Sequence, residues 1–184
     1  MKISISGTAG SGKSTVAKQL AGILGMKHHS VGDLRKEMAK KRNMSLAEFN
    51  KMGEEKDFTD KEADNYQIEL GKKEDGFVID GRLSYHFIPD SLKLFLKAHV
   101  RARSERIYSE ERSEERFRDL GDAIASLIER DKSDKLRYAK YYNLDPSNEL
   151  QFDFVVDTTY LSVNEVVAEI LKFIKQEKII SADS

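Results

Sequence analysis

A glycine-rich turn near the amino terminus constrains the fold of this chain more than any other feature. Gly7 and Gly12 lie five residues apart, and Lys13 and Ser14 follow the second glycine. The β-branched, alternating run at residues 2–6 predicts a strand before the turn, and the apolar spacing over residues 14–24 predicts a helix after it. This context distinguishes the turn from a glycine-rich connection that merely joins a strand to a helix. The pattern is typical of a phosphate-binding loop.

The chemistry of this loop favours a nucleoside triphosphate as its ligand. Glycines let the backbone curl so that successive N–H groups point inward, and the helix that follows adds unpaired amides and the positive end of its dipole. Lys13 can reach the β- and γ-phosphates, and the Ser14 hydroxyl can ligate Mg²⁺. We expect ATP and Mg²⁺ to bind along the whole loop, whose residues are Gly7, Thr8, Ala9, Gly10, Ser11, Gly12, Lys13, Ser14 and Thr15.

The remaining hydrophobic patterns predict an α/β fold. Further strands are expected at residues 27–30, 77–80, 92–98 and 152–158, and helices at 14–24, 101–140 and 162–175, with two or three short helices within 32–73. Strands that alternate with helices form a parallel sheet, so we expect a three-layer sandwich with a five-stranded parallel sheet flanked by helices. One domain should cover residues 1–176, and residues 177–184 should form a frayed tail.

The composition excludes several classes of protein. The chain has 184 residues, about the length of one domain, and its net charge of −1 argues against a general nucleic-acid binder. It has no cysteine and hence no disulfide framework, and its four histidines lack the spacing of a zinc site, so we expect them to be ordinary fold or surface residues. No stretch approaches a membrane-spanning helix or a signal peptide. We expect a cytoplasmic monomer without nucleic-acid or membrane partners.

The sequence also bears on the fate of the γ-phosphoryl group. A switch or a motor transfers it to water, whereas a kinase transfers it to a small acceptor. The guanine-reading pattern Asn-Lys-x-Asp is absent, and the chain is small for a motor. The strand-poor helical region after the second strand suits a lid over an acceptor. These observations favour a kinase.

Several separated motifs resemble those of nucleoside monophosphate kinases, and specifically the short archaeal-type branch of the cytidylate kinases. The resemblance covers residues 1–176. Its first motif, ISGTAGSGKST, is shared with many ATPases and GTPases, whereas VIDGRL at 78–83 and ERDKSDKLRY at 129–138 are more specific; SVGDLRKEMAKKRNMS at 30–45 and DKEADNYQ at 60–67 complete the set. The resemblance implies a P-loop NTPase fold with a helical monophosphate-binding insert at about residues 32–75 and a short lid at about 108–122.

The resemblance assigns the acceptor site to the helical insert. Ser30 and Gly32 open it, with a hydroxyl near the acceptor. The family places an arginine on the acceptor phosphate at the position of Lys36, whereas Arg35 stands one residue earlier, so the choice between these two cations stays open. Asp33 could instead be a helix cap, with both cations on a solvated face.

A second group of insert residues recurs at helical spacing. Asp60, Asp64 and Gln67 lie at positions i, i+4 and i+7 and can share one face of a helix, which the resemblance directs at the cytidine base and sugar. Gln67 can both donate and accept, as a base requires. A polar outer helix face is the alternative.

The apolar run at residues 77–80 ends in an acid. Parallel sheets bind their ligands beyond the carboxyl ends of their strands, which is where this acid would lie. Asp80 terminates an apolar strand, beyond which an open parallel sheet holds its ligands, so it can bind Mg²⁺ directly or through water. Arg82 follows Gly81, and in the resembled family this arginine grips the acceptor phosphate. A surface arginine after a glycine turn is the alternative.

Arg130, Asp134 and Arg137 recur at i, i+4 and i+7, again on one helical face. Two arginines that face one direction need an anion or an acid between them, and a transferring phosphoryl group is such an anion. In the resembled family the arginines meet phosphates or the cytosine, and the aspartate orients them. An exposed i,i+4 ion pair is the alternative.

The lid departs from the family pattern. Arg106 matches a family arginine, but the next expected arginine falls at Glu110, and Arg112 lies two residues further on. The lid residue that reaches the γ-phosphate therefore stays open between Arg106 and Arg112.

Together these features predict Mg²⁺-dependent transfer of a phosphoryl group from ATP to CMP and dCMP. The expected catalytic residues are Lys13, Arg82, Arg130 and Arg137, and the expected metal ligands are Ser14 and Asp80. Two alternatives stay open. One is a kinase of the same fold with UMP or AMP as acceptor, and the other is an ATP-binding switch or assembly module with vestigial kinase activity.

Overall fold

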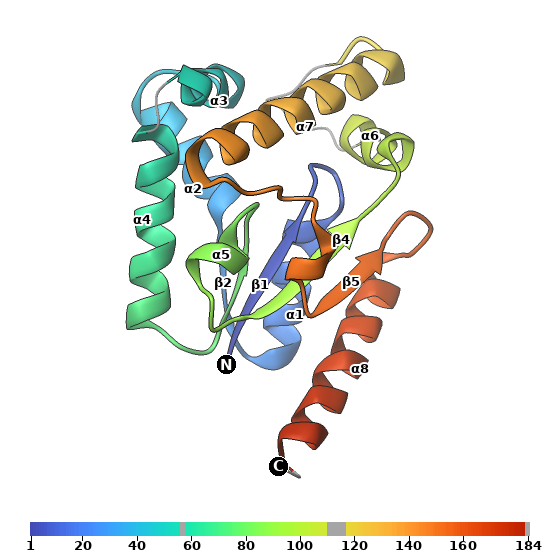
Figure 1. Ribbon diagram of the computed structural model, residues 1–184. Helices are drawn as coiled ribbons and strands as arrows, with labels where there is room; N and C mark the ends of the chain where they lie inside the picture. The colour runs from blue at the N-terminus through green and yellow to red at the C-terminus, as the bar shows by residue number, and fades with distance from the viewer. Residues whose placement is uncertain (56–57, 110–116, 183–184) are drawn as a thin grey trace.

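The computed structural model describes residues 1–55, 58–109 and 117–182. Its centre is a parallel sheet in the order β2-β3-β1-β4-β5 (Figure 1). The strands are β1 (Lys2–Gly7), β2 (Lys27–Ser30), β3 (Phe77–Asp80), β4 (Leu92–Lys97) and β5 (Phe154–Asp157). The predicted five-stranded parallel sheet is therefore confirmed.

The two faces of the sheet carry different layers, as the alternation along β1 requires. Ile3 and Ile5 are fully buried against α1 (Lys13–Leu24) and α8 (Val163–Ala182). Ser4 and Ser6 point to the other face, where the Ser4 hydroxyl accepts from Ser91 at 2.8 Å and the Ser6 hydroxyl donates to the Gly81 carbonyl at 3.0 Å. The short helix α5 (Ser84–Phe87) lies on that second face. The three-layer sandwich is confirmed.

The described residues between β2 and β3 form helices and connecting turns without a strand, as predicted. This region contains α2 (Val31–Lys41), α3 (Leu46–Glu55) and α4 (Phe58–Lys73), which we call the helical insert. Its apolar side chains form one cluster with the β3 residues Phe77 and Ile79. The insert is therefore anchored on the outer part of the sheet beside the strand that ends in Asp80.

The charged region after β4, predicted to be helical over residues 101–140, forms two helices among the described residues. The first is α6 (Val100–Ser109) and the second is α7 (Leu120–Tyr142). The start of α7 is fixed by Asp119, whose carboxylate accepts from the Asp122 backbone N–H at 2.8 Å. Residues 110–116 of the predicted lid, which covers about residues 108–122, lie outside the described residues. Figure 1 shows α7 crossing above the carboxyl ends of the strands, close to α3 and α6.

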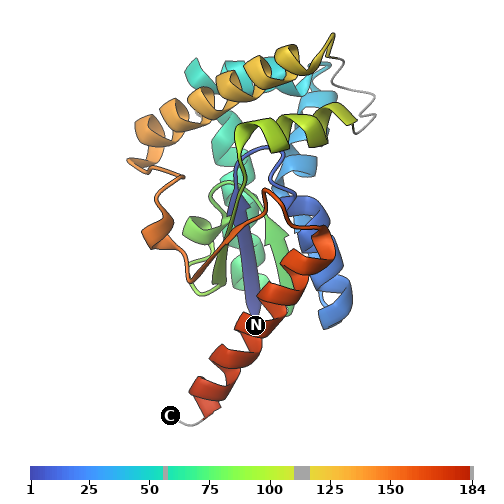
Figure 2. The ribbon, with the colours of Figure 1, turned by 90° about the vertical axis from the view of Figure 1, so that its right-hand side faces the viewer.

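The last helix is longer than predicted. We expected it to end at residue 175 with a frayed tail over 177–184, but α8 continues to Ala182. No glycine or proline occurs in α8, so the backbone meets no local signal to stop. Figure 2 shows its last turns running past the amino-terminal end of the sheet. Within the described part of the chain, no helix is both long enough and apolar enough to span a membrane.

Candidate active site

The functional residues predicted from the sequence gather around one cavity at the carboxyl edge of the sheet. Its volume is about 460 Å³. Its walls come from the glycine-rich loop after β1, the end of β3, the helical insert and α7. Among the predicted residues it is lined by Ala9, Gly10, Gly12, Lys13, Ser14, Thr15, Ser30, Gly32, Arg35, Lys36, Asp60, Asp64, Gln67, Asp80, Arg82, Arg130, Asp134 and Arg137. Gly7 and Thr8 instead line a smaller cavity of about 180 Å³ behind the loop, and the Ser11 side chain is buried inside the loop.

The backbone of the loop requires glycine at its first position. Gly7 has φ of +143°, and a Cβ built on it would lie 2.1 Å from the Leu96 carbonyl oxygen of the neighbouring strand. Gly12 has φ of +87° and directly precedes the first residue of α1. The loop therefore ends at a helix N-terminus whose amides are available to an anion.

A buried arginine outside the loop fixes its far side. Arg103 of α6 donates to the Ala9 carbonyl oxygen at 3.2 Å and to both carboxylate oxygens of Asp131 on α7, at 3.2 and 2.8 Å. Gly10 packs against the same helix, since an added Cβ there would lie 2.8 Å from the Arg103 carbonyl oxygen. The loop, α6 and α7 are thus tied together next to Arg130.

Lys13 lies inside the cavity as a strongly desolvated cation. Its ammonium donates to the Thr8 carbonyl oxygen at 2.6 Å. Burial lowers the pKa of Lys13 well below its ordinary value, and the nearby Arg82 guanidinium lowers it further. Triphosphate oxygens would raise this pKa again, because an opposite charge nearby stabilises the ammonium.

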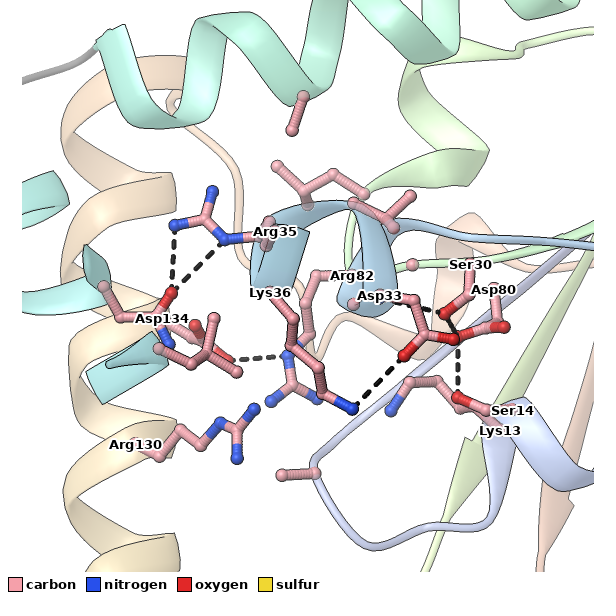
Figure 3. Close-up of a pocket in the computed structure, with 18 of the residues that line it drawn as sticks. Lys13, Ser14, Ser30, Asp33, Arg35, Lys36, Asp80, Arg82, Arg130 and Asp134 are labelled. Atoms are coloured by element: carbon pink, nitrogen blue, oxygen red, sulfur yellow. Dashed lines mark hydrogen bonds and ion pairs between the residues drawn. The ribbon is translucent and has the colours of Figure 1, made fainter. Parts of the chain in front are cut away.

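Asp80 is the junction of three elements (Figure 3). One of its oxygens accepts from the Ser14 hydroxyl at 2.8 Å and from the Ser30 hydroxyl at 3.2 Å. The other lies 2.7 Å from Nε2 of His28. A carboxylate beside a loop serine is the hard oxygen donor set that Mg²⁺ uses together with phosphates and water. Among the described residues no group of three or more His, Asp or Glu side chains could hold a metal, so this pair is the candidate.

Arginines and acids form a continuous network along α7. Arg82 donates to Asp134 at 2.6 Å and to the Gly7 carbonyl oxygen at 2.6 Å. Arg137 donates to the other oxygen of Asp134 at 2.5 Å and to Asp60 of α4 at 3.0 and 3.2 Å. Burial favours the neutral form of Asp134, but the adjacent guanidinium groups lower its pKa below the ordinary value. Two of the three predicted arginines therefore share one ionised acid, and Arg130 lies beside them in the cavity wall.

The two candidate cations of α2 have different surroundings. Arg35 donates to Asn50 at 3.2 and 3.0 Å, to the Thr59 carbonyl oxygen at 3.1 Å and to Asp60 at 2.6 Å. Among the described residues, Lys36 donates to the exposed carboxylate of Asp33 alone, at 3.2 Å. Figure 3 shows the Lys36 ammonium extending toward the side of the cavity where Arg130 and Lys13 lie.

The α4 residues face the cavity together. Asp60, Asp64 and Gln67 all line it, so the predicted shared helical face exists. Asp64 accepts a hydrogen bond from the Tyr142 hydroxyl. Burial raises the pKa of Asp64 to about 6, although the Tyr142 hydrogen bond opposes this rise.

Arg106 supports the loop from the donor side. Its guanidinium donates to the Thr158 hydroxyl at 3.0 Å and also to the Thr158 carbonyl oxygen, while that hydroxyl donates to the Ser11 carbonyl oxygen at 3.1 Å. Arg106 also lines the cavity. Arg112 lies outside the described residues.

Sequence reasoning missed several residues of this site. We predicted an ordinary fold or surface role for His28, but His28 contacts Asp80. His28 and Ser30 lie two residues apart in one strand and therefore share a face of the sheet. This spacing was the sequence signal for His28. Ser84 and Tyr142 contact Gln67 and Asp64 from α5 and α7, and no local pattern links residues so distant in the chain.

Comparisons with known proteins agree with this geometry. The model of the cytidylate kinase-like family matches residues 2–160. A cytidylate kinase from Sulfolobus acidocaldarius is 34% identical over 99% of this chain and 98% of that protein. A cytidylate kinase from Archaeoglobus fulgidus is 36% identical over 97% of each chain.

Solved structures share the fold at low sequence identity. An uncharacterised protein from Eubacterium ventriosum has a TM-score of 0.70 and 21% identity, covering 95% of this chain and 98% of that one. A shikimate kinase from Acinetobacter baumannii, solved with shikimate, has a TM-score of 0.62 and 16% identity over 96% and 94% of the two chains. These likenesses establish a P-loop NTPase α/β fold, and the family match over most of the chain goes further: the protein belongs to the cytidylate kinase-like family.

Proposed function

We propose that this protein transfers the γ-phosphoryl group of ATP to CMP and dCMP in a Mg²⁺-dependent reaction. The observation that carries the proposal is the single cavity in which a triphosphate loop faces the helical insert across a row of arginines. Its volume of about 460 Å³ lies in the range of ligand sites. The loop wall would bind the phosphates of one nucleotide, and the insert wall would bind the phosphate of the other. The archaeal relatives described above are named cytidylate kinases.

The proposed chemistry rests on positioning and charge. Phosphoryl transfer spreads negative charge over the equatorial oxygens, and preorganised cations stabilise it. Lys13, Arg82, Arg130 and Arg137 are the groups proposed for this role, and all four line the cavity. The attacking phosphate oxygen is already anionic, so no general base is needed.

Ser14 and Asp80 would hold the metal ion. When bound, Mg²⁺ neutralises charge on the β- and γ-phosphates. Asp80 is oriented for this by the Ser30 hydroxyl and the His28 imidazole, which occupy different oxygens of the carboxylate. This orientation keeps one edge of the carboxylate beside Ser14.

For the acceptor phosphate we propose Lys36 and not Arg35. Four of the five N–H donors of Arg35 already have protein partners, so Arg35 fixes Asp60 and α3 in place. Lys36 can leave its exposed partner Asp33 at little cost, because such surface pairs contribute about 1 kcal/mol or less. Arg82 and Arg137 would complete the phosphate site.

A coupled assay of ADP release tests this function. ATP·Mg²⁺ is supplied with CMP, dCMP, UMP, AMP, GMP or no acceptor. We expect CMP and dCMP alone to raise ADP release far above the acceptor-free rate. A high rate with UMP or AMP instead would assign another acceptor to the same fold. Equal rates with every acceptor and with none would point to an ATPase switch and overturn the proposal.

A further inference from the structure

Two glycines of the loop carry backbone N–H groups that can serve an anion. Gly10 and Gly12 both line the cavity, and neither N–H donates to a described residue. Both have positive φ, +75° and +87°, a conformation that glycine adopts without strain. Their usefulness to a phosphate depends on whether they point into the cavity, and that direction is set from outside the loop.

A peptide group couples the directions of its two polar atoms. The described residues contain no cis peptide bond, and in a trans peptide the C=O of one residue and the N–H of the next point in opposite directions. The Ala9 carbonyl therefore directs the Gly10 N–H, and the Ser11 carbonyl directs the Gly12 N–H. A partner that holds either carbonyl on the outer side of the loop turns the following N–H inward.

Arg103 of α6 holds the Ala9 carbonyl from the outer side. Its buried guanidinium donates to this oxygen at 3.2 Å and to both carboxylate oxygens of Asp131, at 3.2 and 2.8 Å. This two-pronged ion pair keeps the guanidinium in one orientation. Arg103 is not among the described residues that line the main cavity, and Asp131 lines the smaller cavity behind the loop. The contact with Ala9 therefore lies on the far side of the loop from the ligand.

Thr158, directly after β5, holds the Ser11 carbonyl in the same way. Its side chain is buried, and its hydroxyl donates to that oxygen at 3.1 Å. Arg106 donates to the hydroxyl oxygen at 3.0 Å, so the single hydroxyl hydrogen is directed at the loop. The Thr158 backbone N–H donates to the Lys97 carbonyl oxygen at 2.8 Å, which anchors the residue at the end of β4.

We propose that Arg103 and Thr158 are positioning residues that preset the loop for the phosphates of ATP. They hold two of its carbonyl groups outward, so that the N–H groups of Gly10 and Gly12 face the cavity before the nucleotide arrives. Donors that are already oriented need no reorganisation when the anion binds, and this raises the affinity for the donor nucleotide. The inference rests on the proposed function in taking ATP as the ligand of the loop.

Calorimetric titrations with ADP·Mg²⁺ and with CMP, each added alone, measure the two nucleotide sites separately. Thr158→Val keeps the size of the side chain and removes its hydroxyl, so we expect the Kd for ADP to rise about fivefold, as for one lost hydrogen bond. Arg103→Lys lacks the planar fork that joins Ala9 to Asp131, and we expect a rise of about tenfold or more. The Kd for CMP should change less than about twofold, whereas a general loss of structure would weaken both ligands.

Amide NMR spectra recorded during the ADP titration assign the effect to single peptide groups. In the wild-type protein, ADP should shift the signals of both Gly10 and Gly12. Thr158→Val should change the ADP-induced shift of Gly12 far more than that of Gly10, and Arg103→Lys should do the reverse. A loss of packing around the whole loop would change both signals together in either variant.

Two matched control variants lie on α6 beside Arg103. Arg101→Lys alters an exposed arginine, which donates to Glu105 at 3.0 Å. Ser104→Ala removes a hydroxyl of a buried residue, which donates to the Val100 carbonyl oxygen within the same helix. Both variants should bind ADP and CMP as the wild-type protein does.

The outcomes distinguish this inference from the proposed function. If the wild-type protein binds ADP but does not phosphorylate CMP, the proposed function fails and the ADP titrations still test the loop. If Thr158→Val melts as a folded protein and keeps both the wild-type Kd for ADP and the wild-type Gly12 shift, the inference is wrong while the function stands. Should Arg103→Lys fail to fold, Thr158→Val alone decides. A wild-type protein that binds no ADP would overturn both.

Discussion

At the scale of single residues, Asp80 joins the glycine-rich loop to the start of the helical insert. It ends β3, and its carboxylate contacts Ser14 of the triphosphate loop, Ser30 at the start of the helical insert and His28 of β2. A strand that ends in an acid suggested the position from sequence alone. The three partners were beyond sequence reasoning as a set, since they come from β2 and from the first turn of α1, which only the folded sheet brings beside the end of β3.

Asp80→Asn tests the metal role. The amide keeps the size of the side chain but removes the charge that we propose holds Mg²⁺ near Ser14. We expect kcat to fall about 100-fold and half-maximal activity to require at least about tenfold more Mg²⁺. A Mg²⁺ titration of initial rates measures both. An unchanged Mg²⁺ dependence in a folded variant would assign the metal to other groups.

Lys36→Ala tests the assignment of the acceptor phosphate. Loss of a charged hydrogen bond to phosphate is worth about 2 kcal/mol, so we expect the KM for CMP to rise about thirtyfold while the KM for ATP changes little. Lys40→Ala, on the exposed end of α2, is the matched control and should behave as wild type. A normal KM for CMP in Lys36→Ala would return the role to Arg35.

Asp64 predicts a pH-dependent effect on stability. Its pKa is near 6 in the folded protein and 3.8 ordinarily, so the folded state binds the proton more tightly and the protein loses stability as pH rises through the window from about 4 to about 6. The charges that face it come from Asp60, Arg35 and Arg137. Asp64→Asn should therefore raise the melting temperature at pH 7.5, and the difference should vanish below pH 4. A constant difference across this range would contradict the raised pKa.

At the scale of elements, α7 organises the arginines. Arg130, Asp134 and Arg137 recur at the spacing that places side chains on one face, and the structure aims that face at the cavity. This part of the site was predictable, because helical period depends only on local sequence. Where helices begin and end was not: Asp119 starts α7 by capping it, and α8 extends beyond residue 175 because nothing in its sequence stops it.

The shared acid of α7 gives a prediction about the network. Asp134→Asn leaves Arg82 and Arg137 without the carboxylate between them. Breaking a buried pair in this way costs about 3 kcal/mol, so we expect the free energy of unfolding in urea to fall by about that amount. Asp122→Asn, in an exposed i,i+4 pair at the start of the same helix, should cost less than about 1 kcal/mol. Similar losses in both variants would show that the network is no stronger than a surface pair.

At the scale of the whole molecule, the helical insert and α7 enclose the cavity from two sides. Tyr141 and Tyr142 near the end of α7 donate to the insert at Gly53 and Asp64. Enclosure matters in a kinase because water is a competing acceptor for the γ-phosphoryl group. The sequence predicted a helical insert, but the aromatic contacts that close it join residues about 80 positions apart or more and have no local signature.

Tyr141→Phe tests this closure. A single neutral hydrogen bond contributes about 1 kcal/mol, so the ratio of ATP hydrolysis to phosphoryl transfer should rise about fivefold. Inorganic phosphate and CDP are quantified in the same reaction. Tyr85→Phe, whose hydroxyl donates to Gln151 at 3.1 Å outside the insert, should leave the ratio unchanged. An equal rise in both variants would argue against the closing role of Tyr141.

The position of β1 in the sheet has a consequence for how the protein is made. β1 is synthesised before the other four strands of the sheet, yet it lies at the centre, where Ile5 pairs with Asp80 on one side and with Leu94 on the other. Both edges of this strand must wait for partners that the ribosome adds much later, and pairings of such long sequence separation form slowly. The glycine-rich loop after β1 therefore takes its final shape only after β4 has been translated.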